Sequence, residues 1–110
     1  MSGYSIYDIH DTQDLLELRD ELRVSMHALR EAYKEGLCGK DIIQAIFEGQ
    51  VIENYPRRRR VLIAALVEDT DVPMHVVCDY ADIKEIVAVT VYIPTRSHWT
   101  ANLVRKCTDD

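Results

Sequence analysis

The chain has 110 residues, a formal net charge of −6 and a hydrophobic content of 47%. This length fits one domain, and the hydrophobic content excludes a wholly disordered chain. The longest apolar run, Val61–Val67, is far shorter than the roughly 18–20 residues that cross a bilayer, so no membrane association is expected. Residues 1–10 lack the basic start and apolar stretch of a secretory signal, so we expect a cytoplasmic protein.

Three helices are predicted in the first half of the chain. Asp11 or Thr12 can cap the first helix and Ser25 the second, and apolar residues follow each cap at helical spacing. The predicted helices are a leucine-rich one from about residue 12 to residue 22, Met26–Glu35 and Lys40–Glu48. Between the first two, Arg23 and Val24 are expected to form a short extended link.

The second half of the chain has the composition of strands joined by short turns. The predicted strands are Val51–Tyr55, Arg60–Val67, Met74–Tyr80 and Glu85–Ile93. Short connections favour antiparallel neighbours, and helices followed by strands indicate the α+β class. We therefore predict N-terminal helices packed on a curved antiparallel sheet of about four strands. Residues 1–21 are interpreted as an N-terminal extension with a helix, and 22–110 as a single domain.

The strand pattern places several polar side chains on one face of this sheet. In the last strand, the face assigned to the core holds Val87, Val89, Val91 and Ile93, and the other holds Ile86, Ala88, Thr90 and Tyr92. If Tyr80 pairs with Glu85 across the intervening loop, His75 lies opposite Thr90. His75, Thr90 and Tyr92 would then form a polar cluster on the less apolar face.

Two further groups of polar residues have both a structural and a functional interpretation. His27 and Arg30 share one stripe of the second helix, which is either a solvated face or part of a site. The run Arg57–Arg60 is a charged hairpin, a phosphate clamp, or a binding surface for an acidic protein segment. The four histidines form no close ligand pair with a cysteine, and no nucleotide-binding or serine-hydrolase motif is present. No metal site and no cofactor are therefore expected.

Five short segments together resemble a small bacterial and archaeal family of unknown function that is placed near the RelE/ParE-like ribonuclease toxins. The segments are Ser25–Arg30, Lys40–Gly49, Val51–Pro56, Pro73–Val77 and Val89–Pro94, within roughly Leu22 to Trp99. The resemblance implies the RelE/ParE-like fold. It also implies that the recurrent polar positions of the family are His27, Arg30, Tyr55, His75, Thr90 and Tyr92.

The resemblance further implies a toxin component that cleaves RNA without a metal, by attack of a ribose 2′-hydroxyl on the adjacent phosphate. Such a site must move two protons and stabilise charge on the phosphate. We expect the catalytic residues to be His75, His27, Arg30 and Tyr92. The expected phosphate- or RNA-binding residues are Arg57, Arg58, Arg59, Arg60, Tyr55 and Thr90. The expected partners are an RNA substrate and an antitoxin, which by resemblance is a small zinc-finger protein.

A second hypothesis is a non-catalytic protein-interaction module on the same scaffold. The net charge of −6 disfavours binding to a polyanion, and the sequence has no strong catalytic motif. The arginine run and the polar helix stripe would then bind a protein. Self-association is a further expectation, because a sheet edge or the leucine stripe of the first helix could form a homodimer.

Overall fold

The computed structural model describes residues 8–94, which form an α+β domain. The elements in chain order are α1 (Thr12–Leu18), β1 (Glu21–Val24), α2 (Met26–Lys34), α3 (Gly39–Glu48), β2 (Gln50–Tyr55), β3 (Arg60–Leu66), β4 (Pro73–Asp79) and β5 (Glu85–Tyr92). The predicted class and the predicted helices and strands are thus confirmed to within a few residues. The prediction of about four antiparallel strands was wrong, because the described sheet has five strands and is mixed.

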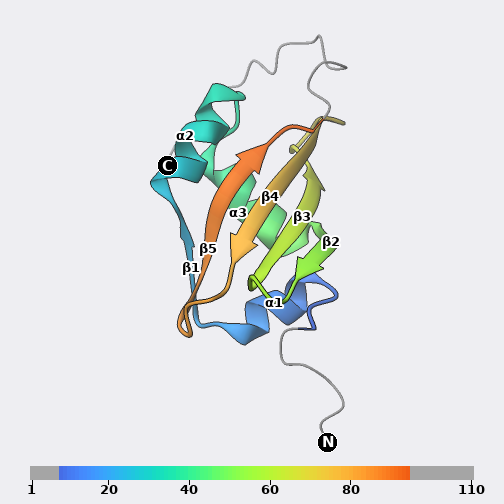
Figure 1. Cartoon of the computed structure of the whole chain (residues 1–110). Helices are drawn as coiled ribbons and strands as arrows, with labels where there is room; N and C mark the ends of the chain where they lie inside the picture. The colour runs from blue at the N-terminus through green and yellow to red at the C-terminus, as the bar shows by residue number, and fades with distance from the viewer. Residues whose placement is uncertain (1–7, 95–110) are drawn as a thin grey trace, which may run out of the picture.

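The sheet has the order β1-β5-β4-β3-β2, and its helices lie on one face. In Figure 1, α3 lies behind the sheet and α2 lies beside the upper end of β5. α2 packs mainly against β5 and α3 mainly against β3, whereas α1 packs against α3. Within residues 8–94, the opposite face of the sheet carries no helix, and we call it the uncovered face.

The fifth strand comes from the segment that was predicted to be a link. β1 pairs in parallel with β5, from Glu21 opposite Glu85 to Val24 opposite Ala88. On the uncovered face, the Arg23 guanidinium donates two hydrogen bonds to the Glu85 carboxylate, at 3.2 and 3.0 Å. The sequence did not reveal this strand because four residues show no clear period, and their partner is more than sixty residues away.

Helix caps and sheet alternation produce a single core between the helices and the sheet. The Asp11 and Ser25 side chains accept hydrogen bonds from the first turns of α1 and α2, as predicted. Leu15 of α1 is fully buried in the same core as Ile46 of α3 and Val76 of β4. The first helix therefore contributes to the core of the domain, while the division of the chain at residue 21 stays a prediction.

A β-bulge changes which side chains of β5 face the core. Cys78 pairs with Ala88 but Val77 pairs with Thr90, so Val89 is an extra residue between two registers. Ile86 and Ala88 are buried before the bulge, and Val91 and Ile93 are buried after it. The prediction was thus correct for Val91 and Ile93 and wrong for Val87 and Val89, which are only half-buried.

Candidate functional site

The uncovered face brings His75 of β4 and Tyr92 of β5 together. They are opposite each other in the register, with His75 Nδ1 3.2 Å from the Tyr92 hydroxyl oxygen. Their rings meet edge to face, with centroids 5.2 Å apart and an interplanar angle of 72°. The predicted contact of His75 with Thr90 was wrong, because Thr90 lies opposite Val77. The observed register differs from the predicted one by two residues. Because side chains alternate between faces, a shift of two keeps His75, Thr90 and Tyr92 on the same face.

Two residues of β2 extend this group toward the edge of the sheet. The Tyr55 hydroxyl donates a hydrogen bond to the Glu53 carboxylate, and this bond raises the pKa of Tyr55. The charge of Glu53 also acts on His75, and Tyr92 is close enough to Tyr55 to raise its pKa electrostatically. We call Glu53, Tyr55, His75 and Tyr92 the uncovered-face cluster.

Small and apolar residues of β3 lie between the two halves of the cluster. Ala64 is opposite His75 on β4, and Leu62 is opposite Glu53 on β2. A methyl group at position 64 leaves room above the sheet for the longer side chains of neighbouring strands. Leu62 is only 8% exposed, although no helix of the described chain covers this face. Tyr55 and Tyr92 are 44% and 37% exposed, so the cluster is a polar surface that is partly open to solvent.

The electrostatics of the cluster favour an uncharged His75. Partial burial lowers the pKa of His75 because it penalises the imidazolium, and the charge of Glu53 opposes this effect only in part. A neutral imidazole has one nitrogen that accepts a proton. His75 can therefore act as a base at neutral pH, with the Tyr92 hydroxyl holding its other nitrogen.

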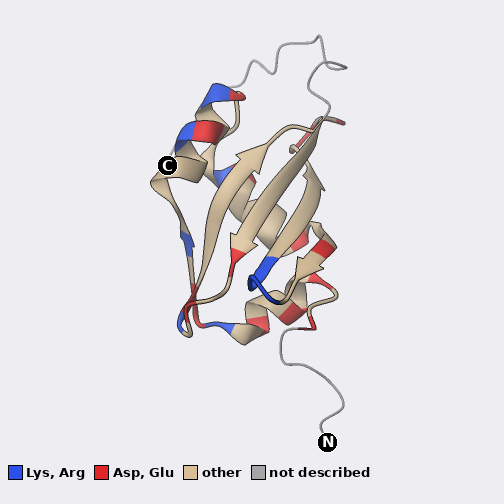
Figure 2. Ribbon diagram, in the orientation of Figure 1, with Lys and Arg blue, Asp and Glu red and all other residues tan. Residues whose placement is uncertain are grey.

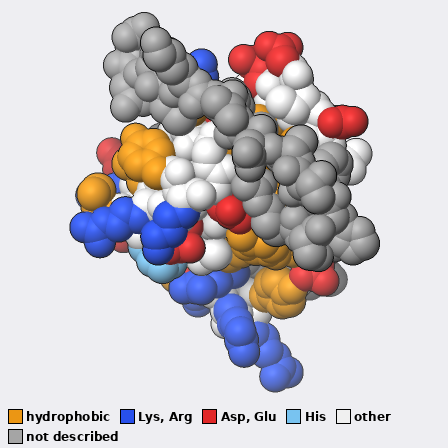
Figure 3. Space-filling view, turned by 90° about the horizontal axis from the view of Figure 1, so that it is seen from above, with side chains coloured by type: hydrophobic (Ala, Val, Ile, Leu, Met, Phe, Trp, Pro, Cys, Tyr) orange, Lys and Arg blue, Asp and Glu red, His pale blue; other side chains and the backbone are white. Residues whose placement is uncertain are grey.

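The four consecutive arginines have different environments. Arg57, Arg58 and Arg59 are exposed in the β2–β3 turn, which Figure 2 shows as a basic hairpin tip at the lower end of the sheet. Arg60 instead donates from Nε to the Asp79 carboxylate at 2.8 Å. Arg58 lowers the pKa of Tyr55, so its charge acts directly on the cluster. Seen from above, basic side chains lie along the left and lower parts of the view, and one more shows at the top (Figure 3).

The predicted residues of the second helix lie apart from the cluster. His27 and Arg30 are exposed on α2, which packs against β5 on the helix-bearing face. On the same helix, Lys34 pairs with Glu31 at 3.3 Å. In the part of the chain that the structure describes, no hydrogen bond or ion pair joins His27 or Arg30 to the cluster. The structure thus joins His75, Tyr92 and Tyr55, places Thr90 beside them, and leaves the helix residues separate.

Glu53 is the member of the cluster that the sequence analysis missed. Positions 53 and 55 alternate along one strand, so the pattern could have placed Glu53 on the same face as Tyr55. Its relation to His75, however, depends on the order β4-β3-β2 in the sheet. The short turns favour that order, but the register that brings Glu53 near His75 is not evident from the sequence.

Residues 8–94 give little support for a metal site, a cysteine nucleophile or a membrane-spanning helix. No group of three or more His, Cys, Asp or Glu residues in this range is arranged to hold a metal ion. Burial raises the pKa of the Cys78 thiol to about 12, which removes it as a nucleophile near neutral pH. Among the described helices, none is long and apolar enough to cross a membrane.

Comparison with known proteins identifies a family but no activity. A family model described as a domain of unknown function, DUF4258, matches residues 24–93. The chain belongs to the DUF4258 family. The DUF4258 match extends from the end of β1 to just beyond β5 and so contains the whole uncovered-face cluster. No curated protein and no solved structure matches the chain.

Proposed function

We propose that this DUF4258 protein is a metal-independent endoribonuclease, the toxin component of a toxin–antitoxin pair in the cytoplasm. The observation that supports this most is the contact between His75 and Tyr92 on the face of the sheet that no described helix covers. A neutral imidazole beside a phenol is a pair of groups that can exchange protons with RNA. By its resemblance to the RelE/ParE-like toxins, the protein would be inhibited by an antitoxin.

The reaction follows from the chemistry of the RNA backbone. The ribose 2′-oxygen attacks phosphorus, the bond from phosphorus to the 5′-oxygen breaks, and a 2′,3′-cyclic phosphate and a 5′-hydroxyl form. His75 takes the 2′-hydroxyl proton on Nε2 while its Nδ1–H donates to the Tyr92 oxygen. The Tyr92 hydroxyl is then the candidate donor of a proton to the departing 5′-oxygen. Loss of either proton-transfer group should slow cleavage by about 10²–10⁴.

The arginines of the turn are assigned to the phosphate. Arg58 is the best candidate because its charge already reaches Tyr55 in the cluster. Arg60 contributes less, since its guanidinium is bound to Asp79. Among the described residues, His27 and Arg30 have no contact with the cluster. They can take part in catalysis only if the RNA extends from the uncovered face to α2.

Cleavage of a mixed RNA by the purified full-length protein, in the presence of a chelator, tests this function. We expect fragments that end in 2′,3′-cyclic phosphate, and we expect His75→Ala and Tyr92→Phe to lose most of the activity. His10→Ala is the matched control, because His10 is exposed and its ion pair is with Asp8, at the start of the described chain. Equal cleavage by all these proteins would refute the assignment.

A non-catalytic interaction module is the second candidate function. It is favoured by the net charge of −6 and by the pairing of Arg23 and Arg60 with carboxylates on the uncovered face. Under this alternative, the folded protein has no ribonuclease activity and its induced expression does not arrest growth. A folded sample without cleavage and without toxicity would therefore favour the module.

A further inference from the structure

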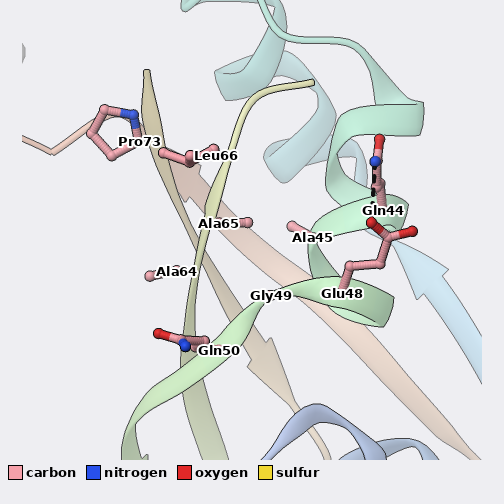
Figure 4. Close-up of a pocket in the computed structure, with 9 residues that line it drawn as sticks. All are labelled: Gln44, Ala45, Glu48, Gly49, Gln50, Ala64, Ala65, Leu66 and Pro73. Carbon is pink, nitrogen blue, oxygen red and sulfur yellow. Dashed lines mark hydrogen bonds between the residues drawn. The ribbon is translucent and has the colours of Figure 1, made fainter. Parts of the chain in front are cut away.

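A cavity of about 470 Å³ lies where α3 ends and β2 begins, beside the last residues of β3. Ala45 of α3 and Ala65 of β3 point toward each other across it (Figure 4), and their methyl groups leave space that larger side chains would fill. Leu66 and Pro73 add apolar surface at one end, and Leu66 is 63% exposed. The cavity is therefore lined in part by apolar groups that water solvates poorly.

Among residues 8–94, no strand pairs with the last main-chain groups of β3 on the side of this cavity. Ala64 pairs with Gln50, the first residue of β2, so β3 continues past its neighbour to Leu66. On the β4 side, the N–H of Val67 donates to the carbonyl of Val72 at 2.9 Å. Hydrogen bonds alternate in direction along a strand of an antiparallel sheet. The N–H and C=O of Leu66 therefore point away from β4, toward the side on which β2 would lie if it began two residues earlier.

The rim of the cavity is negatively charged. Glu48, in the last turn of α3, is exposed, and its carboxylate accepts only an amide hydrogen bond from Gln44, at 3.3 Å. Within residues 8–94, no ion pair involves Glu48. Outside the lining, the turn that follows Leu66 and Val67 carries three more exposed carboxylates, at positions 68, 69 and 71. A ligand with positive charge is therefore favoured at this rim.

We propose that this cavity docks an extended segment of a partner protein that contains lysine or arginine and continues the line of β2 along β3. The main chain of the segment would pair with the N–H and C=O of Leu66, as in other strand additions. A small apolar side chain would enter between Ala45 and Ala65, and a basic side chain would reach Glu48. This docking does not depend on the proposed ribonuclease activity.

Titration of ¹⁵N-labelled full-length protein with two blocked peptides tests the proposal. The probe is acetyl-Lys-Val-Lys-Val-Lys-amide, and the matched control is the same peptide with glutamate in place of lysine. The basic peptide should shift the Leu66 amide resonance and slow its hydrogen exchange, and the acidic peptide should do neither. A basic peptide methylated on its main-chain nitrogens keeps its side chains but should lose most of its affinity.

Protein variants separate the proposed rim charge from the overall charge of the protein. Glu48→Gln should weaken the basic peptide several-fold, because it removes the nearest carboxylate. Glu17→Gln on α1 removes the same charge elsewhere on the surface and should leave binding unchanged. Equal weakening by both variants, or equal binding of the methylated peptide, would overturn the proposal. Protection of the Leu66 amide from hydrogen exchange that increases with protein concentration would also overturn the proposal. A second copy of the chain would then be the occupant.

Discussion

Substitution of Gly49 by alanine is expected to destabilise the fold by separating α3 from the sheet. An ideal Cβ at this position would lie 2.6 Å from the carbonyl oxygen of Ala45, 2.7 Å from Ile63 Cγ2 and 2.8 Å from the carbonyl oxygen of Ala64. Two of these atoms belong to the backbone, so they cannot rotate away as a side chain can. Overpacking in a core costs about 1–3 kcal/mol, and we expect Gly49→Ala to fall in the upper half of that range.

The glycine at the other end of the same helix is the matched control. A Cβ on Gly39 would meet only Leu29 Cδ1, at the ordinary contact distance of 3.5 Å. Since alanine is the better helix former, Gly39→Ala should be neutral or stabilising by up to about 1 kcal/mol.

Urea and thermal unfolding, followed by circular dichroism, measure both variants. In a domain of this size, 1 kcal/mol shifts the Tm by roughly 4–8 °C, so Gly49→Ala should lower the Tm by on the order of 10 °C. If Gly49→Ala were as stable as the parent protein, or if both variants changed the Tm alike, the close approach of α3 to β3 would be wrong.

Three further predictions concern titratable groups. Because folding lowers the pKa of His75, the unfolded chain binds more protons, so the free energy of unfolding should fall as the pH drops below about 6.5. Urea unfolding at pH 7.5 and 5.5 should show a smaller fall for His75→Gln, and an unchanged pH dependence would contradict this. Glu53→Gln should lower the pKa of His75 further, because the Glu53 charge supports the imidazolium. An NMR titration of the ring protons measures that pKa, and a rise would refute the proposed proximity. Cys78, with its pKa raised to about 12 by burial, should resist alkylation at pH 8 in the native protein and react after denaturation. Mass spectrometry of the labelled peptides detects either result, and rapid native labelling of Cys78 would show that the residue is accessible.

The helices and most strands could be predicted because their signals are local. Asp11 and Ser25 cap their helices through hydrogen bonds to residues three positions later, which the sequence displays directly. The alternation of buried and half-buried residues along β4 also follows from neighbours two positions apart. Alternation along β5 also placed Thr90 and Tyr92 on one face, whereas adding His75 to them needed an assumed register.

The register and the fifth strand could not be predicted in this way. The bulge at Val89 reverses the faces of β5 halfway along the strand. The pairing before the bulge already differs by one residue from the predicted register, and the bulge adds a second, so the partner of His75 is Tyr92 and not Thr90. β1 becomes a strand because Leu22 and Val24 can bury their side chains beside Ile86 and Ala88, at the distant edge of the sheet. Both outcomes depend on packing between segments that are far apart in the chain.

The α+β class, the positions of the helices and most strands, and the polar face of β4 thus follow from the amino-acid sequence alone. Each of these depends on backbone preferences and side-chain periods within a few residues. Three relations came from the folded structure alone: Glu53 acts on His75, Asp79 binds Arg60, and β3 extends past the described part of β2 to Leu66. These relations depend on strand order and register, which are set by the packing of the whole core.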